Sequence, residues 1–485
     1  MPHERRISVW GIDSPAGKGN DLAMISWLAE LCSGSSTDLE ISAQAVGNTF
    51  EGWGTSLAWF ANVVGKGPTE RKERMADLLF DEQQGLGLNI VRYNIGGGEN
   101  PNIPVTLEPR ACIPGLYTSA HQVNSLSLEQ DSGQLWFLHA AVKRGADKFE
   151  VFSNSPPYFM TKSGSVTGAK CSQENNLLED QVDIFTEYLC KSTQLLEDSC
   201  SLKCTSIEPF NEPVSSWWKF GGRQEGCYFD CPLQEKTINS LYERISKSEL
   251  SCCGIAAPDT YSTEEARTLV NSYSMQTLSQ LARINTHTYS AKERKKLSEV
   301  CVQKGKELWV SEYGDNDNSG ITLAHTIISD LKELNPSAWI YWQAIEDSSA
   351  PSWGFLVCHL NQPNRDDSFS IEKKYYIMSQ FTKFIRPGFQ QLHIDDSTTV
   401  GFRSPDESLL VLVHVERGRP KTYHIHLKDY HHNKDTADIS VYRTSREENR
   451  KRIAFHSRWP LQRRFSLEMA ANSVTTIVVH FVVYE

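Results

Sequence analysis

From about residue 50 to residue 386 the sequence alternates short apolar runs with longer stretches of helical spacing. Short buried strands that alternate with helices are typical of parallel βαβ units. The strand-like runs begin near Phe50 and continue at 88–95, 149–154, 205–210, 252–258, 284–289, 307–312 and 338–344. The helical stretches are 55–61, 132–144, 177–197, 234–247, 263–282, 291–304, 322–334 and 371–384. Eight strands in this order predict an α/β chain with a (β/α)8 TIM barrel and long loops.

The pattern of apolar and polar residues changes outside residues 47–386, which we assign to the barrel. Residues 387–485 carry β-branched or alternating runs with polar turns between them and no long helix, which predicts a C-terminal antiparallel β-sandwich. Residues 39–46 have the pattern of a strand, and we expect this strand to join the sandwich. Residues 1–38 have no strong periodicity and are interpreted as an N-terminal extension.

Charge and hydropathy exclude some partners. The net charge of −11 argues against nucleic acid or an anionic membrane surface as the main partner. No apolar run approaches the ~18 residues that a transmembrane helix requires, so no transmembrane segment is expected. The oligomeric state has no signature in the sequence.

The compartment stays open at this stage. The apolar stretch at 22–29 is flanked by Asp21 and Glu30, which a signal peptide normally avoids. Eight of the 12 cysteines lie between Cys171 and Cys253. They contain no Cys-x-x-Cys and no histidine lies among them, which disfavours a zinc site. Disulfides and free buried thiols both remain possible.

Two carboxylates follow strands on opposite sides of the predicted barrel. Glu212 comes just after the fourth strand, between Pro209 and Pro213, and Glu312 closes the seventh. Catalytic groups of such barrels lie at the carboxyl ends of the strands, so these two side chains are expected to face each other. A facing pair of this kind can hydrolyse a glycosidic bond, because one group protonates the leaving oxygen and the other attacks the sugar or activates water.

Other strand ends carry polar and aromatic groups that point to the same place. These segments are Arg92–Gly98, Ser153–Tyr158, His287–Tyr289 and Tyr341–Gln343. No Gly-Lys-Ser/Thr follows the three glycines at 96–98, which argues against a nucleotide-binding loop. Trp217, Trp218 and Trp353 are expected on loops, where an indole can contact a sugar.

Four motifs resemble glycoside hydrolase family 30, a retaining family. They are Glu-Gly-Trp-Gly-Thr-Ser-Leu-Ala-Trp at 51–59, Ser-Asn-Ser-Pro-Pro-Tyr-Phe-Met at 153–160, Glu-Pro-Phe-Asn-Glu-Pro at 208–213 and Ser-Glu-Tyr-Gly at 311–314. The first two are most similar to the endo-β-1,6-galactanase subgroup, as is Gln-Glu-Gly-Cys at 224–227. The resemblance covers nearly all of the chain from about residue 39 and implies secretion, although no clear signal peptide is present.

The resemblance implies a role for each site residue. Glu212 would be the acid/base and Glu312 the nucleophile, so Glu212 has to keep a proton near neutral pH while Glu312 is ionised. Asn211 would bind the 2-hydroxyl of the sugar, Tyr289 would lie near the nucleophile, and Trp342 would form the floor of the subsite. The other substrate-binding residues expected in the pocket are Trp53, Arg92, Asn94, Asn154 and Trp218.

The expected substrate is the β-1,6-galactan side chain of arabinogalactan, a polysaccharide or oligosaccharide, and no metal or organic cofactor is implied. Similar chemistry on β-1,6-glucan, xylan or a glucosyl lipid is the alternative, because small changes in loops switch the sugar. A third hypothesis is a carbohydrate-binding protein that has this fold but no catalytic activity. Endo and exo action are not distinguished.

Overall fold

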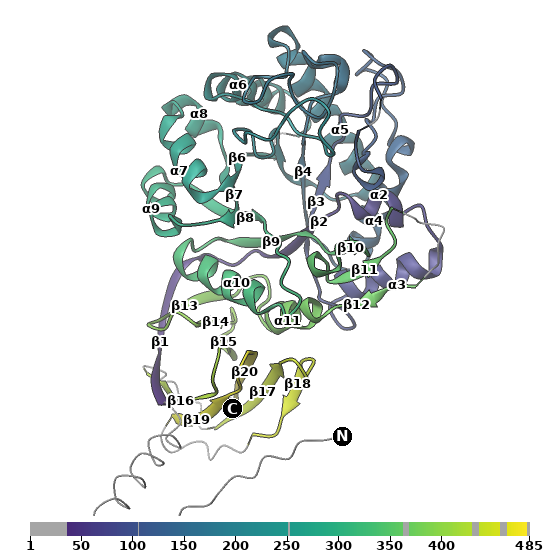
Figure 1. Ribbon diagram of the computed structural model, residues 1–485. Helices are drawn as coiled ribbons and strands as arrows, with labels where there is room; N and C mark the ends of the chain where they lie inside the picture. The colour runs from purple at the N-terminus through teal and green to yellow at the C-terminus, as the bar shows by residue number, and fades with distance from the viewer. Residues whose placement is uncertain are drawn as a thin grey trace, which may run out of the picture.

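The computed structural model describes residues 36–104, 106–250, 253–361, 368–428, 436–455 and 463–482. Residues 1–35 of the expected N-terminal extension lie outside the described residues. Its last three residues, 36–38, begin strand β1 (Ser36–Thr49). Figure 1 shows a barrel in the upper part of the molecule and an accessory sheet below it, with helices between the two.

Eight parallel strands form the closed barrel, as the sequence predicts. They are β2 (Gly52–Ser56), β3 (Ile90–Asn94), β4 (Lys148–Phe152), β5 (Cys204–Glu208), β6 (Gly254–Ser262), β7 (Arg283–Ser290), β8 (Glu307–Glu312) and β9 (Ala338–Gln343). The first and last strands close the ring, with Trp53 paired to Trp339 and Gly54 to Ile340. Strand β2 includes Thr55 and Ser56, so the helix expected at 55–61 was placed too early.

Helices cover the outside of the barrel. They are α2 (Phe60–Val64), α3 (Thr69–Phe80), α4 (Ser132–Lys143), α5 (Val182–Cys200), α6 (Cys231–Ser246), α7 (Thr263–Ser272), α8 (Met275–Gln280), α9 (Arg294–Lys304), α10 (Ile321–Glu333) and α11 (Lys373–Thr382). Their ends follow from local chemistry: Asp230 caps α6 by accepting the N–H of Leu233, and Gly305 ends α9 in the left-handed region. The single helix expected at 263–282 is divided into α7 and α8.

Short elements lie in the loops between barrel units. Strands β10 (Ile345–Asp347), β11 (Leu356–Cys358) and β12 (Ser370–Ile371) form a small sheet after β9. Five 3-10 turns occupy Pro109–Ala111, Leu128–Asp131, Tyr158–Met160, Glu179–Gln181 and Pro351–Trp353. These long loops follow the carboxyl ends of the strands, where the sequence places its candidate residues.

The accessory domain is one curled sheet of nine strands. Besides β1 it contains β13 (Gln390–Ile394), β14 (Thr399–Arg403), β15 (Leu409–Glu416), β16 (Lys421–Leu427), β17 (Thr436–Thr444), β18 (Lys451–Ile453), β19 (Arg464–Met469) and β20 (Ser473–Val482). Strand β1 pairs antiparallel with β13 and parallel with β16, so the sheet is not purely antiparallel as predicted. The strands from opposite halves enclose a common apolar core.

The apolar run of β15 explains how the two domains are joined. Leu410 and Leu412 lie in the core of the accessory sheet, whereas Val411 and Val413 belong to the core that continues into the barrel. Side chains of a strand alternate between its two faces, so a strand that is buried on both faces has to be apolar throughout. Helices α10 and α11 lie between the barrel and the sheet (Figure 1).

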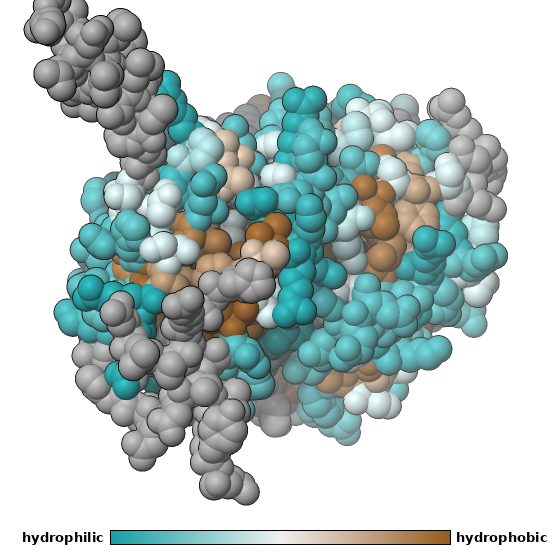
Figure 2. All heavy atoms as spheres, turned by 90° about the horizontal axis from the view of Figure 1, so that it is seen from below, coloured by the Kyte–Doolittle hydropathy of each residue, from teal (hydrophilic) through white to brown (hydrophobic). Residues whose placement is uncertain are grey.

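The surface is mostly polar. On the face shown in Figure 2, hydrophilic side chains surround separate hydrophobic patches. None of the described helices combines the length and apolar character needed to cross a membrane. The cysteines of the described ranges other than Cys358 are free thiols, which decides for those nine between the two alternatives that the sequence left open.

Candidate active site

Glu212 sits at a tightly held turn beyond the end of β5. Its N–H donates to the carbonyl of Asp259 (2.7 Å), and its own carbonyl accepts the indole N–H of Trp218 (2.8 Å). Its φ is +48°, a left-handed conformation that costs a non-glycine residue about 1 kcal/mol. The neighbouring prolines and these two hydrogen bonds therefore fix the direction of a strained carboxylate-bearing residue.

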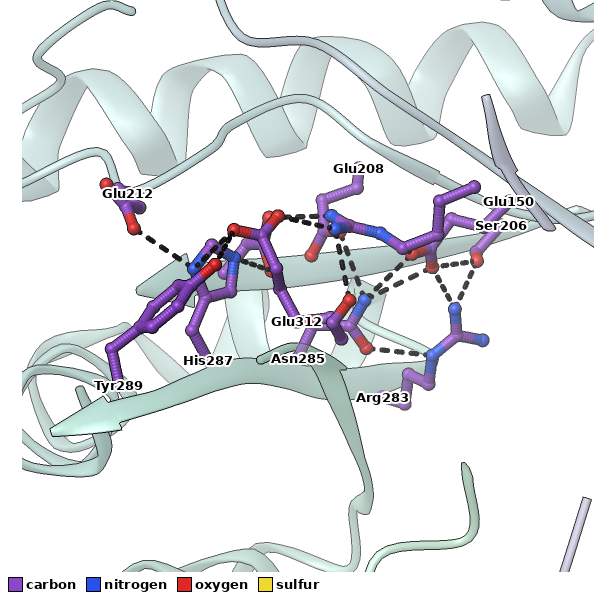
Figure 3. A network of polar contacts seen from close by, with 12 residues as sticks. Glu150, Ser206, Glu208, Glu212, Arg283, Asn285, His287, Tyr289 and Glu312 are labelled. Atoms are coloured by element: carbon purple, nitrogen blue, oxygen red, sulfur yellow. Dashed lines mark hydrogen bonds and ion pairs between the residues drawn. The ribbon is translucent and has the colours of Figure 1, made fainter. Parts of the chain in front are cut away.

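Glu212 and Glu312 meet across the barrel mouth with His287 between them. One oxygen of each carboxylate and a ring nitrogen of His287 all lie within 4.8 Å of one another. His287 Nδ1 is 3.1 Å from Glu212 Oε1 and 3.5 Å from Glu312 Oε1. The hydroxyl of Tyr289 donates to the same oxygen of Glu312 over 2.9 Å. Figure 3 shows this group at one end of a continuous polar network.

Arg92 lies beneath the site and holds Glu312 from the inside of the barrel. Its guanidinium is 3.2 Å from Glu312, 3.1 Å from Glu150, 2.7 Å from Glu208 and 2.8 Å from Asp259. The side chains of all but Glu312 are completely buried. Burial and the neighbouring acids Asp259 and Glu150 raise the pKa of Glu208 well above its usual range, and the charge of Arg92 only partly opposes this rise. Glu208 therefore helps to hold Arg92 beneath the site and does not line the pocket.

Burial sets the protonation of the two central groups. It raises the pKa of Glu312 to about 7, against the opposing charges of His287 and Arg92. For His287, burial disfavours the charge, but the carboxylates of Glu312 and Asp259 outweigh it and raise the pKa well above the usual value. His287 is thus an imidazolium at neutral pH. Burial thus opposes the ionisation that Glu312 needs as a nucleophile, and the charges of His287 and Arg92 favour it.

The same three residues have the spacing of a possible cation site. A metal needs the lone pair of a neutral imidazole, because coordination requires a deprotonated ligand. His287 instead has Nδ1 directed to Glu212 and Nε2 at 3.1 Å from Asp259, both acceptors for an imidazolium. The arrangement fits proton transfer better than metal binding.

A cavity of about 310 Å³ opens above the carboxylates, at the lower end of the range for small-molecule pockets. Its walls combine aromatic rings with amides and carboxyl groups. The lining residues are Trp59, Asn154, Asn211, Glu212, Trp217, Gln224, Glu225, Tyr261, Tyr289, Glu312, Trp342 and Trp353. Of the ten predicted site residues, six therefore reach the cavity: Asn154, Asn211, Glu212, Tyr289, Glu312 and Trp342.

Trp53 is not in the pocket, and its prediction as a binding residue is corrected. Its side chain is fully buried and its indole N–H donates to the carbonyl of Ile385 (2.8 Å). The ring packs against Phe50 and against Phe381 of α11, between the barrel and the accessory sheet. Trp53 points outward from β2 and therefore reaches the layer between the two domains. Only side chains that point into the barrel, or that follow the end of a strand, reach the barrel mouth.

Arg92, Asn94 and Trp218 lie behind the lining and do not form it. Arg92 and Asn94 have no exposed surface, and Trp218 is 2% exposed. The ring of Trp218 packs on Gly226 so closely that a Cβ there would clash with it. Its neighbour Trp217 is 46% exposed and lines the cavity instead. The loop thus turns the second indole inward to hold Glu212 and the first one toward the pocket.

Several residues of the site, some of which line the cavity, were not among the predicted site residues. His287 was noted at a strand end but given no role. Tyr261 lies beyond the end expected for the strand at 252–258, because β6 continues to Ser262. Trp59 follows the end of β2 by three residues, a position that a correct strand boundary would have indicated. Glu225 and Gln224 come from the long loop between β5 and α6, whose path the sequence does not specify.

Comparisons with known proteins found relatives of this chain. The model of O-glycosyl hydrolase family 30 matches residues 36–259. An endo-β-1,6-galactanase from Hypocrea rufa is 31% identical over 411 residues, which cover 80% of this chain and 82% of that protein. An exo-β-1,6-galactobiohydrolase from Bifidobacterium longum subsp. longum is 25% identical over 62% of this chain, but only 26% of that protein is matched.

Solved structures share the fold at lower identity. The catalytic domain of the family 30 xylanase C from Talaromyces cellulolyticus superposes with a TM-score of 0.71, at 20% identity, over 91% of this chain and all of that domain. A conserved exported protein from Bacteroides fragilis reaches a TM-score of 0.78 at 23% identity, again over 91% of this chain and all of that protein. At these identities the likeness shows the architecture and not the substrate.

Proposed function

Since this chain belongs to glycoside hydrolase family 30 and is a glycoside hydrolase, we propose that it cleaves β-1,6-linked galactan with retention of configuration. The observation that carries the proposal is the pair of carboxylates, Glu212 and Glu312, with oxygens within 4.8 Å of each other. Retaining enzymes have carboxyl groups about 5–5.5 Å apart, whereas inverting enzymes leave about 6.5–9.5 Å for a water molecule. The separation favours direct attack by one carboxylate.

In the first step Glu212 gives its proton to the glycosidic oxygen, and Glu312 attacks the anomeric carbon as the bond to that oxygen breaks. In the second step Glu212 takes a proton from water, whose oxygen replaces Glu312 at the anomeric carbon. The free acid of Glu212 and the free carboxylate of Glu312 are then restored. Neither step needs a group beyond the two carboxylates and water.

The surrounding residues hold the nucleophile in place. Tyr289 and Arg92 each reach an oxygen of Glu312, one to Oε1 and one to Oε2, so the carboxylate cannot rotate freely. The imidazolium of His287 lies 3.5 Å from Glu312 and stabilises the negative charge of the nucleophile. Asn211, next to the acid, lines the cavity and is the candidate for binding the 2-hydroxyl.

The substrate is proposed from relatives whose names agree on the linkage. The galactanase from Hypocrea rufa and the galactobiohydrolase from Bifidobacterium longum both carry β-1,6-linked galactose in their names, although one is named as an endo-enzyme and the other as an exo-enzyme. The more complete match, over 82% of that protein, is to the endo-enzyme. We therefore place endo-cleavage of β-1,6-galactan first.

Proton NMR of the first products tests the mechanism and the substrate together. Arabinogalactan freed of arabinose should yield short β-1,6-galacto-oligosaccharides whose new reducing ends appear first as the β-anomer. Parallel digests of β-1,6-glucan and xylan should release much less reducing sugar. An initial α-anomer would refute retention, and a preference for xylan or glucan would refute the substrate.

Two substitutions separate the roles of the carboxylates. Glu312→Gln should abolish turnover, because an amide cannot form the glycosyl ester. Glu212→Ala should lose activity on the polymer but still form the glycosyl ester from a nitrophenyl β-galactobioside, whose leaving group needs no proton; azide then attacks this ester and gives a β-galactosyl azide. Circular dichroism checks that both variants fold. Hydrolysis at the wild-type rate by Glu312→Gln contradicts the assignment.

A further inference from the structure

A third carboxyl group, that of Glu225, lies in the wall of the pocket and has no part in the two steps above. Glu225 is only 2% exposed, yet it lines the same cavity as Glu212 and Glu312. It comes from the loop between β5 and α6, and it approaches the end of β3. In the order of the barrel strands, β3 lies opposite β7, the strand that carries His287 and Tyr289.

Two donors from the β3 end hold the Glu225 side chain. The backbone N–H of Gly97 donates to Oε1 over 2.9 Å, and the amide of Asn94 donates to Oε2 over 3.4 Å. Among the described residues, no lysine, arginine or histidine forms an ion pair with this carboxyl group. Its position is thus fixed by hydrogen bonds to neutral groups and not by a counter-charge.

Glu225 is a neutral carboxylic acid at neutral pH. Burial and the charges of Asp131 and Glu99 together raise its pKa to about 8, in spite of the bonds from Gly97 and Asn94. The titratable groups that act on it are all acids, phenols or a thiol: Glu99, Asp131, Tyr117, Tyr188 and Cys112. A neutral carboxyl group can donate one hydrogen bond and accept others, which matches a sugar hydroxyl that does both.

Two buried amide oxygens, one behind Glu225 and one in the cavity lining, lack a hydrogen-bond donor among the described residues. Asn94 Oδ1 and Asn211 Oδ1 have no hydrogen-bond partner within the described part of the chain, although both residues are at least nine-tenths buried. Leaving a buried polar atom unpaired is costly, so such atoms are expected to find a partner when the site is occupied. Asn211 lines the cavity itself, and Asn94 lies directly behind Glu225.

We propose that Glu225, positioned by Asn94 and Gly97, binds the C3 or C4 hydroxyl of the sugar whose glycosidic bond is cleaved. The inference rests on the proposed function: Asn211 is assigned to the 2-hydroxyl, and C6 carries the linkage in a β-1,6 chain. Only the hydroxyls at C3 and C4 are then left for this wall. Glu225 is a specificity-determining residue and Asn94 is a positioning residue that acts through it.

The test uses nitrophenyl β-glycosides of β-1,6-galactobiose, either intact or deoxygenated at C2, C3 or C4 of the sugar that bears the nitrophenyl group. The kcat/KM of each is measured for the wild type, Glu225→Ala and Glu225→Gln. Glu225→Ala should lose about tenfold to hundredfold on the intact substrate and far less on either the 3-deoxy or the 4-deoxy compound. Glu225→Gln, which keeps both a donor and an acceptor, should recover part of the loss.

A control variant and a pH series separate recognition from simple damage. Glu99→Gln removes an acid from the same β3 loop without touching the cavity, and it should show no preference among the deoxygenated substrates. Ionisation of Glu225 removes its donor, so the wild-type KM should rise above about pH 8, and this rise should be absent in Glu225→Gln. Thermal unfolding of each variant shows whether it is folded.

The outcomes also distinguish this inference from the proposed function. An equal loss on all four substrates, or no loss in Glu225→Ala, would show a structural role and overturn the inference while hydrolysis by the wild type upholds the function. A loss that is reduced only on the 2-deoxy compound would place Glu225 at the 2-hydroxyl and overturn the inference. Failure of the wild type to cleave any of the galactobiosides would overturn the proposed function and, with it, the inference.

Discussion

Replacing His287 by glutamine should move the acidic limb of the kcat/KM profile to higher pH. His287 Nδ1 lies 3.5 Å from the Glu312 carboxylate, and the imidazole is held in its charged form by Glu312 and Asp259 in spite of burial. Glutamine is of comparable length but has no charge. The substitution therefore removes one buried positive charge from beside the nucleophile and leaves a group that still forms hydrogen bonds.

The size of the effect follows from the distance. Two unit charges 3.5 Å apart interact by about 4.7 kcal/mol at an effective dielectric constant of about 20. Since one pKa unit is about 1.36 kcal/mol, the upper limit is a rise of roughly 3.5 pH units. The glutamine amide can still donate a hydrogen bond to a carboxylate, so a rise of about one to two pH units is expected.

The sign follows from the form of Glu312 that reacts. Burial already raises the pKa of Glu312 to about 7, and His287 opposes that rise. Loss of the imidazolium therefore raises the pKa further. Because only the ionised carboxylate attacks the sugar, the variant should lose activity at neutral pH and recover part of it in alkaline buffer.

The assay is kcat/KM on β-1,6-galactan across the pH range for the wild type and His287→Gln. The matched control is His414→Gln, because His414 is a buried histidine in the accessory sheet with Nε2 also 3.5 Å from a carboxylate, that of Glu416. The control should keep the wild-type profile. If a folded His287→Gln protein has its acidic midpoint where the wild type does, the electrostatic reasoning is refuted.

Two further substitutions test the hydrogen bond that Tyr289 donates to Glu312 and the placement of Trp53 outside the pocket. Tyr289→Phe removes the hydroxyl that donates to Glu312 over 2.9 Å, and kcat should fall roughly 10- to 100-fold, as expected for a hydrogen bond to a charged group; steady-state rates within twofold of the wild type would contradict this role. Trp53→Ala empties a fully buried site between the two domains, so urea denaturation should show a loss of about 3–5 kcal/mol in unfolding free energy. Its KM should stay at the wild-type value, and a raised KM would return Trp53 to the binding site.

The sequence by itself determined the barrel and the two carboxylates. The alternation of apolar strands and amphipathic helices can be recognised from short segments of the sequence, because the spacing of the apolar residues shows which face of each strand or helix is buried. Glu212 and Glu312 could be placed at one mouth because the carboxyl ends of parallel strands share an edge. Boundaries were less certain: Tyr261 was missed because β6 runs four residues past the expected end at residue 258.

Only the tertiary structure decided which of the neighbouring side chains reach the sugar. Trp217 and Trp218 are adjacent and chemically alike, yet one lines the cavity and the other supports Glu212, because a loop without a regular period sets their directions. The protonation of His287 and Glu225 was equally hidden. It depends on burial and on charges from β6, β8 and the loop between β3 and α4, and such interactions between distant segments exist only once the barrel has closed.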